Sequence, residues 1–239
     1  MIKLVTLDLW DTLIIDKKDN ERKQDLKRTD FIVKTLNLFD EYRGKITDHF
    51  DELDKSLKYP SNENDWTITP EAQLQHLFTT INAYPSDKQF LSILRFYTEC
   101  DLDNPPVLIE NDINICLEKL KENYKLVLIS NTGRTPGRVL KRLLRELKIL
   151  NYFDMLIFSD EVKMRKPAPK IFFTACEAFH VLPEETMHVG DSMLIDFNGA
   201  LSAKVNPVLY LPNGNPPATP FIRSLFELKD SMGKYYDKN

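Results

Sequence analysis

The stretch that decides the fold is KLVTLDLWDTL, residues 3–13, at the start of the chain. Its first part is apolar and rich in strand-forming residues, which is typical of a strand buried on both faces. Two carboxylates and a hydroxyl follow at the carboxyl end of this strand, on Asp8, Asp11 and Thr12. Ligands bind at this edge in open α/β sheets. Aspartate is also common in turns and helix caps, so this stretch alone leaves both interpretations open.

Composition narrows the class of protein. The chain has 239 residues, 42% of them hydrophobic and 28% charged, and this is enough to bury a full core. A net charge of −4 argues against nucleic-acid binding, which favours a basic surface. No apolar run reaches the roughly 20 residues that cross a membrane, and the N-terminus is predicted as a strand rather than a signal peptide. We expect a small-molecule partner, with no nucleic acid or membrane, and the sequence does not predict the oligomeric state.

Three cysteines, Cys100, Cys116 and Cys176, show neither paired spacing nor metal-ligand spacing. We expect buried thiols in a reducing compartment, and therefore a cytoplasmic protein.

Strand and helix patterns alternate through most of the chain. Four further buried-type strands are predicted, at 125–130, 155–159, 186–191 and 206–211. Amphipathic helices are predicted at 107–121, 138–150, 169–180, 197–203 and near 221–228. This alternation predicts a Rossmann-like α/β core, with a parallel sheet and helices on both faces.

Residues 16–104 show no strand pattern. After the charged segment 16–30, apolar residues spaced three to four apart predict helices near 31–39 and 46–57. Two more helices are predicted to begin at Thr69-Pro70-Glu71 and at Pro85-Ser86-Asp87, and residues 59–64 are predicted as a turn. The sequence thus predicts an α/β core of residues 1–15 and 105–239, with a helical insert at 16–104.

Polar side chains follow each of the first four predicted strands. Besides Asp8, they are Ser130, Asn131 and Thr132, then Lys166, then Asp191 and Asp196. The carboxyl ends of parallel strands share one edge, where carboxylates can hold Mg²⁺ and a hydroxyl with a lysine can hold an anion. A lysine at this edge would also keep Asp8 ionised. Taken singly, these residues also fit helix caps, turns or a solvated lysine.

Four motifs together resemble the haloacid dehalogenase superfamily, whose members are mostly phosphatases. They are DLWDT at 8–12, SNT at 130–132, KP at 166–167 and GDSMLID at 190–196, in the family's order, and the helical insert lies where that family has its helical cap. The resemblance implies that Asp8 is a nucleophile that forms an aspartyl intermediate, that Ser130 binds the transferred group and that Lys166 balances charge.

The resemblance also implies a Mg²⁺ site. Asp8, Asp191 and the backbone carbonyl of Trp10 would be ligands, and Asp196 would support the metal or Lys166. Further substrate contacts are assigned by the same resemblance to Thr12, Asn131 and Thr132. Substrate choice would depend on cap side chains such as Tyr59, Trp66, His49 and His76.

Trp10 departs from the phosphatase pattern, which has a second aspartate there as general acid and base. Losing that group typically costs roughly 10²–10⁴-fold in rate. Strand alternation points Asp11 the opposite way, unless the turn redirects it.

Three interpretations of function therefore remain. The two-acid fourth motif favours a Mg²⁺-dependent phosphatase of a small phosphorylated metabolite. Trp10 favours either a 2-haloacid dehalogenase or a non-catalytic binding protein. The dehalogenase would need a cap arginine, for which Arg22, Arg28 and Arg43 are candidates.

Overall fold

The computed structural model describes residues 1–59, 67–215 and 218–236. Its contacts divide the chain into two compact units. The first comprises residues 1–15, 107–131 and 144–239, and the second comprises 16–106 and 132–143. The sequence analysis assigned 132–143 to the α/β core, whereas its contacts group it with the helical insert.

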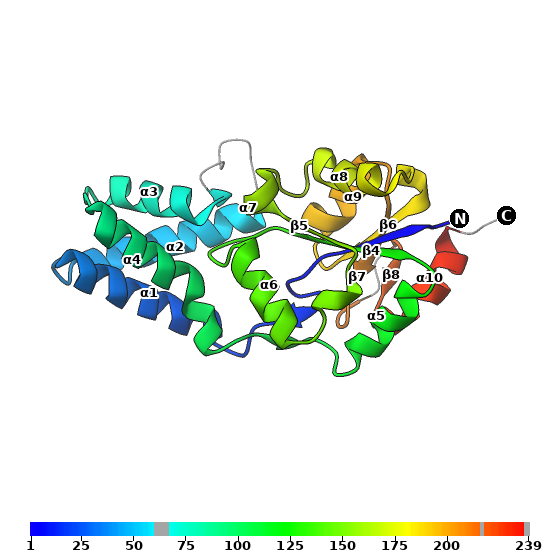
Figure 1. The fold of residues 1–239 in the computed structure, drawn as a ribbon, viewed down its shortest axis with the longest axis horizontal. Helices are drawn as coiled ribbons and strands as arrows, with labels where there is room; N and C mark the ends of the chain where they lie inside the picture. The colour runs from blue at the N-terminus through cyan, green and yellow to red at the C-terminus, as the bar shows by residue number, and fades with distance from the viewer. Residues whose placement is uncertain (60–66, 216–217, 237–239) are drawn as a thin grey trace. The chain divides into compact units, whose positions relative to one another are not determined.

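A six-stranded parallel sheet forms the centre of the first unit (Figure 1). In spatial order its strands are β5 (Met155–Phe158), β4 (Lys125–Ser130), β1 (Leu4–Leu7), β6 (Thr186–Gly190), β7 (Asn206–Tyr210) and β8 (Phe221–Ile222). The chain builds outward from β1 on one side through β4 and β5, then crosses to β6 on the other. The predicted parallel α/β fold is confirmed, and the strand order places a topological switch point at β1, where such sheets bind ligands.

Helices cover both faces of this sheet. α8 (Pro169–Phe179) and α9 (Asn198–Ser202) lie on one face, and α5 (Ile113–Lys121) and α10 (Leu228–Tyr235) lie on the other (Figure 1). Apolar side chains of α8 and α9 pack against those of β1, β4 and β5 in one buried cluster. Shorter elements complete the unit: α7 (Ser159–Val162), η3 (Leu150–Tyr152), η4 (Pro183–Glu185), η5 (Met193–Phe197) and η6 (Leu225–Glu227).

Two predicted helices of the first unit begin later than expected. Val107–Leu108 is β3, which pairs antiparallel with β2 (Ile14–Ile15), and α5 begins only at Ile113. Phe221–Ile222 is the edge strand β8, and α10 begins only at Leu228. Such two-residue strands depend on a partner that is distant in sequence, so hydrophobic periodicity does not reveal them.

The described residues of the second unit include four helices and the 3₁₀ turn η2 (Cys100–Asp103), together with residues 137–143 of α6 (Gly137–Glu146). The helices are α1 (Asn20–Leu36), α2 (Tyr42–Lys58), α3 (Pro70–Thr80) and α4 (Asp87–Glu99). Two predicted helix starts are confirmed, because Thr69 caps α3 through Ala72 N and Ser86 forms a capping box with Gln89. Residues 60–64 of the turn predicted at 59–64, and also Trp66, lie outside the described residues.

α1 begins at Asn20, well before the predicted helix. Its first turns bury polar side chains, including Gln24, Arg28 and Thr29, instead of an apolar stripe. Arg28 donates to Tyr97 O at 3.0 Å and pairs with Asp101 at 2.9 Å. Because these contacts are polar, apolar spacing does not detect this part of the helix.

The segment 132–143 bonds to each of the four helices of its unit. Arg134 pairs with Asp25 of α1 at 3.1 Å and with Asp54 of α2 at 2.7 Å. On α3, the Gln73 side chain donates to Gly133 O at 3.2 Å. On α4, Arg138 pairs with Glu99 at 3.0 Å. These contacts explain why the segment groups with the helical insert.

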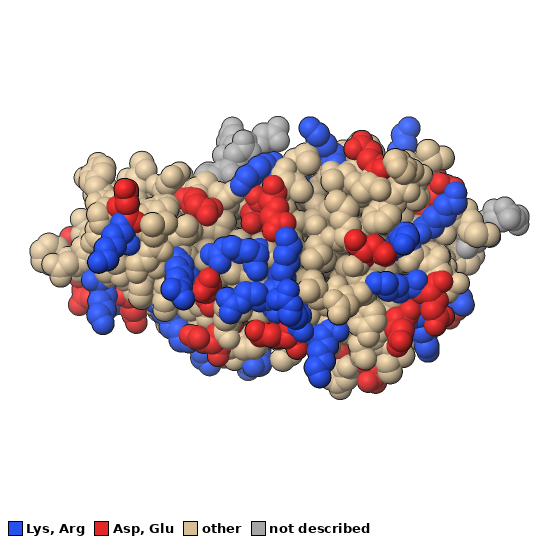
Figure 2. All heavy atoms as spheres, in the orientation of Figure 1, with Lys and Arg blue, Asp and Glu red and all other residues tan. Residues whose placement is uncertain are grey.

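The three cysteines are free and buried, as predicted. No helix within the described residues is long and apolar enough to span a bilayer. Figure 2 shows basic side chains gathered over α6, with acidic side chains beside them. The expected partners stay predictions.

Candidate active site

A tight turn follows β1 and sets the position of the first motif. Leu13 N and Ile14 N both donate to Leu9 O, at 2.8 and 3.0 Å, and Asp11 N donates to Ile14 O at 2.8 Å. Asp11 lies in the left-handed region, with φ of 55°. Asp8, immediately before the turn, is 7% exposed at the carboxyl end of the strand.

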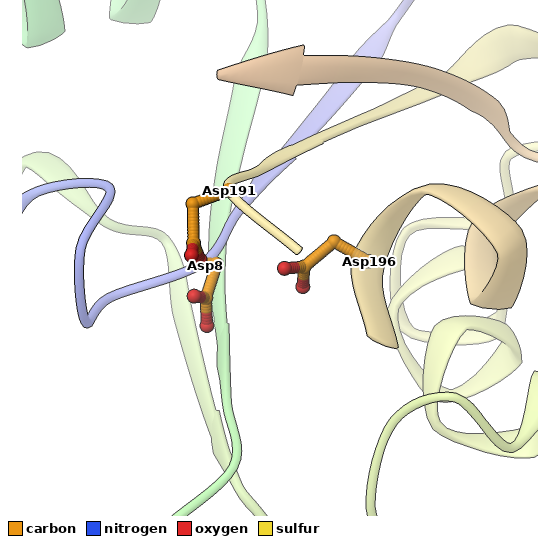
Figure 3. A group of neighbouring side chains, drawn as sticks. All are labelled: Asp8, Asp191 and Asp196. Atoms are coloured by element: carbon orange, nitrogen blue, oxygen red, sulfur yellow. The ribbon is translucent and has the colours of Figure 1, made fainter. Parts of the chain in front are cut away.

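Three carboxylates converge at this edge of the sheet. Asp8 follows β1, Asp191 follows β6, and Asp196 comes from the π-helical turn η5 (Figure 3). Each offers an oxygen within 4.8 Å of the others. Lys166 Nζ contacts Asp8 Oδ1 at 2.5 Å and Asp196 Oδ1 at 2.6 Å. One lysine facing three carboxylates leaves this acidic cluster with an excess of negative charge when all are ionised.

Burial raises the pKa of Asp8 to about 8, with the charges of Asp196 and Asp191 adding to the effect and Lys166 opposing it. Burial also raises the pKa of Asp191 to about 7, together with the charges of Asp196 and Asp11. Lys166 opposes this rise in the pKa of Asp8, as expected, but desolvation of the carboxylate is the larger effect.

Asp196 differs from the other two acids. Burial alone would raise its pKa, but Lys166 and His188 together hold that pKa well below its usual range. Its Oδ1 accepts from Lys166 and faces His188 Nε2 at 3.1 Å, and its Oδ2 accepts from Ser192 N at 3.0 Å. Asp196 is therefore a well-anchored carboxylate that supports Lys166.

Asn131 holds the loop that carries Lys166. Its side chain accepts from Lys166 N and donates to Lys166 O, both at 2.8 Å. Sequence analysis assigned Asn131 to substrate binding, but its amide is committed to the backbone of Lys166. A side chain that bonds both the backbone N–H and the backbone C=O of one residue fixes the position of that residue, here the lysine of the cluster.

The other predicted site residues lie outside the acidic cluster. Ser130 ends β4, is buried, and donates to Asn131 O at 3.3 Å. The Thr12 hydroxyl is also buried and has no hydrogen-bond partner among the described residues, and its predicted substrate contact stays a prediction. Trp10 forms a bridge with Ile14 in the turn. Thr132 is buried in the other unit, and its predicted substrate contact stays a prediction.

The family profile described as haloacid dehalogenase-like hydrolase matches residues 29–209. The chain belongs to this hydrolase family. The chain is similar to members of this family that are named for different activities. It is 30% identical over 112 residues to the N-acylneuraminate-9-phosphatase of Rattus norvegicus, covering 46% of this chain and 44% of that one. The match thus spans less than half the length of that relative.

A second relative matches over a longer stretch. The glyceraldehyde 3-phosphate phosphatase of Pyrococcus abyssi is 26% identical over 226 residues, covering 88% of this chain and 82% of that one. Among solved structures, a 2-haloacid dehalogenase from Pseudomonas syringae pv. Tomato superposes with a TM-score of 0.70 at 20% identity, covering 98% of this chain and 100% of that one. The superposition shows a shared fold, so the function must be argued from the site.

The acidic cluster suits a divalent cation. Hard cations prefer oxygen ligands, and the raised pKa values of Asp8 and Asp191 show how poorly these carboxylates tolerate ionisation without added positive charge. A cation would favour their ionised forms. Asp8 and Asp191 are the better ligand candidates, because both oxygens of Asp196 are engaged by protein donors.

Arg28 does not provide a free guanidinium for a dehalogenase substrate. Its side chain is buried, and its donors go to Asp25, Asp101 and Tyr97 O. Arg43 is half-exposed and pairs with Asp30 and Asp40. Arg22 is exposed on α1, which fits a solvated arginine.

Gly190→Ala is expected to disrupt the acidic cluster. A Cβ at position 190 would lie 2.2 Å from Asp196 Cγ and 2.6 Å from Asp196 Cβ, so η5 must shift. Misplacing a catalytic group by about 1 Å can cost roughly 10²-fold in rate. We expect at least that loss in kcat, measured as phosphate release under the conditions proposed below.

A control for this substitution lies on α2. Nothing lies within 4 Å of a Cβ at Gly44, so Gly44→Ala should keep wild-type kcat and, through helix propensity, gain up to about 1 kcal/mol in the free energy of unfolding. Wild-type kcat in Gly190→Ala would show that the position of Asp196 does not matter.

Proposed function

We propose that this chain is a Mg²⁺-dependent phosphatase of a small phosphorylated metabolite. The main observation behind the proposal is the acidic cluster of Asp8, Asp191 and Asp196 around Lys166. Such a cluster suits a metal-dependent phosphatase, whereas a dehalogenase would need the nucleophile Asp8 but no metal. Similarity to two relatives named as phosphatases supports it.

In this reaction, direct roles belong to Asp8, Asp191 and Lys166 of the cluster. Lys166 holds Asp8 Oδ1 and leaves Oδ2 to attack phosphorus; the bond to the ester oxygen breaks, and that oxygen leaves with a proton. Water then attacks the aspartyl phosphate and releases inorganic phosphate, restoring the Asp8 carboxylate. In this proposal the Ser130 hydroxyl and Lys166 bind the phosphoryl oxygens. Mg²⁺, when held by Asp8 and Asp191, would neutralise phosphoryl charge and keep Asp8 ionised.

The leaving group lacks the usual proton donor. Position 10 is Trp, which carries no titratable acid, and its absence typically costs roughly 10²–10⁴-fold. Asp11 is close enough for its charge to raise the pKa of Asp191, and it is the nearest acid in sequence that could supply the proton. We therefore expect slow turnover.

A second candidate is a dehalogenase acting on a small 2-halo acid, which Trp10 favours. In that reaction Asp8 would displace halide from carbon, and no metal would be required. Two observations weigh against it. The Arg28 side chain already donates to Tyr97 O, Asp25 and Asp101, and the acidic cluster is of the kind that could hold a metal ion.

The test is phosphate release from an aryl phosphate and from small phosphorylated sugars, with Mg²⁺ and with EDTA. The phosphatase proposal predicts release that EDTA abolishes and added Mg²⁺ restores. Halide release from chloroacetate that is insensitive to EDTA would instead establish the dehalogenase. Absence of both activities would favour the non-catalytic binding protein.

A further inference from the structure

His188 is a buried polar residue that the roles above leave unexplained. It lies in the middle of β6, 1% exposed, directly opposite Thr6 of β1. Its Nδ1 is 2.8 Å from Thr6 Oγ1, and its Nε2 is 3.1 Å from Asp196 Oδ1. The ring packs edge-on against Phe172, with centroids 4.9 Å apart. The imidazole therefore has one position, with a polar partner on each nitrogen.

The two partners determine where the proton lies. The Asp196 carboxylate only accepts hydrogen bonds, so a lone pair on Nε2 would face another acceptor. Nε2 must therefore carry the proton and donate to Asp196 Oδ1. In the neutral ring Nδ1 then accepts from the Thr6 hydroxyl, 2.8 Å away. The same hydroxyl also lies 3.1 Å from Met187 O, the other acceptor for its single proton. Burial lowers the pKa of His188, which favours this neutral form.

We propose that His188 is a positioning residue whose Nε2–H holds the Asp196 carboxylate against Lys166, with Asp196 setting the tautomer and the Thr6 hydroxyl bonding the other nitrogen. Its effect on rate rests on the proposed function, whereas the tautomer and the hydrogen bond do not.

This hydrogen bond matters because Asp196 Oδ1 is shared. The same oxygen contacts Lys166 Nζ at 2.6 Å, and that Nζ contacts Asp8 at 2.5 Å. Without the His188 donor, Oδ1 keeps only Lys166 and Oδ2 keeps only Ser192 N, so the carboxylate loses one of its three hydrogen bonds. Asp196 would then hold Lys166, and through it Asp8, less firmly.

Two matched pairs of variants test the proposal. His188→Gln can keep a side-chain N–H toward Asp196 and an acceptor toward Thr6, whereas His188→Leu removes both. Thr6→Ser keeps the hydroxyl, whereas Thr6→Val keeps the shape without it. Supporting partners of this kind typically contribute roughly 10–100-fold to metal affinity or activity.

The expected results separate positioning from folding. His188→Leu should lose about 10–100-fold in kcat with little change in KM, and should weaken Mg²⁺ binding measured by calorimetry. His188→Gln should recover most of the lost kcat and most of the lost Mg²⁺ affinity. Thr6→Ser should have a higher kcat than Thr6→Val. The proposal would be overturned if His188→Gln and His188→Leu were equally impaired, or if His188→Leu had wild-type kcat and wild-type Mg²⁺ binding.

A spectroscopic readout is independent of both activity and metal. Long-range ¹H–¹⁵N correlation spectra of the wild-type protein resolve the histidine tautomers, and His188→Gln identifies the His188 signal among the four histidines. We expect a protonated Nε2 and an unprotonated Nδ1. A protonated Nδ1 with a bare Nε2, or rapid averaging of the two forms, would refute the proposal. The expected tautomer in a protein without phosphatase activity would leave the positioning role standing and reject only the proposed function.

Discussion

Asp8→Asn is expected to reduce phosphate release by at least about 10³-fold while leaving the folded protein as stable as the wild type or more so. The amide cannot form the aspartyl phosphate, so the covalent route is lost. Asn has nearly the same shape as Asp, and its carbonyl oxygen can still accept from Lys166 Nζ, which lies 2.5 Å from Asp8 Oδ1. The loss would therefore be chemical rather than structural. Activity above a tenth of the wild-type rate would exclude Asp8 as the nucleophile.

The stability part of this prediction depends on pH. In the folded protein the pKa of Asp8 is raised from 3.8 to about 8. Between these values the unfolded chain loses a proton that the folded protein retains, so Asp8 destabilises the fold as pH rises through this window. Asn removes the penalty, and we expect a gain of about 1–3 kcal/mol at pH 8 in EDTA, shrinking toward pH 4.

Thermal unfolding in EDTA at several pH values measures this difference. The exposed Asp87, in the first turn of α4, provides the control. Asp87→Asn should keep wild-type activity and show no such pH-dependent gain. A gain in Asp8→Asn that does not grow with pH would contradict the assigned cause.

The ends of the strands were predictable from the sequence, because the burial and the polarity of the residues change there together. An apolar run ends, a carboxylate or hydroxyl follows, and a parallel sheet brings these ends to one edge. Asp8, Lys166, Asp191 and Asp196 meet in the structure for this reason. Their mutual distances result from two features that no motif specifies: the turn at Asp11 and the π-helical turn that returns Asp196 toward Gly190.

The sequence analysis did not identify His188 as a site residue, and the reason is different. It lies within an apolar strand, where a single polar residue is ordinarily a core position. Its role depends on the register that sets it opposite Thr6 and on its contact with Asp196. The sequence shows which charges are neighbours of Asp8, but not how completely its carboxylate is desolvated. The signal that could have found His188 is a titratable residue in a strand leading into a catalytic motif.

The placement of 132–143 with the helical insert likewise depends on contacts between residues far apart in sequence. Arg134 is the centre of these contacts, at 7% exposure, with Asp25 and Asp54 as partners. Its guanidinium also donates to Phe50 O and lies 5.2 Å from the centroid of that ring. No apolar periodicity marks such a residue, and the sequence analysis did not single it out.

Arg134→Met is therefore expected to cost about 3–5 kcal/mol in the free energy of unfolding, because it leaves two carboxylates near a buried position without their cation. Methionine keeps the apolar stem, so the loss reports charge rather than volume. Denaturant unfolding measures it. Neutralising both partners as well, in Asp25→Asn and Asp54→Asn combined with Arg134→Met, should recover part of the loss, since unpaired charge is its cause.

Arg43→Met is the matched control, since Arg43 also pairs with two carboxylates but its side chain is 43% exposed. Exposed ion pairs contribute about 0–1 kcal/mol, so this variant should unfold nearly as the wild type does. Similar losses in the two arginine variants would mean that burial does not determine the effect. A large loss in Arg134→Met alone would establish that buried charge holds the segment that follows Ser130-Asn131-Thr132. The second motif would then lead directly into a segment whose stability depends on its ion pairs with the helices of the second unit.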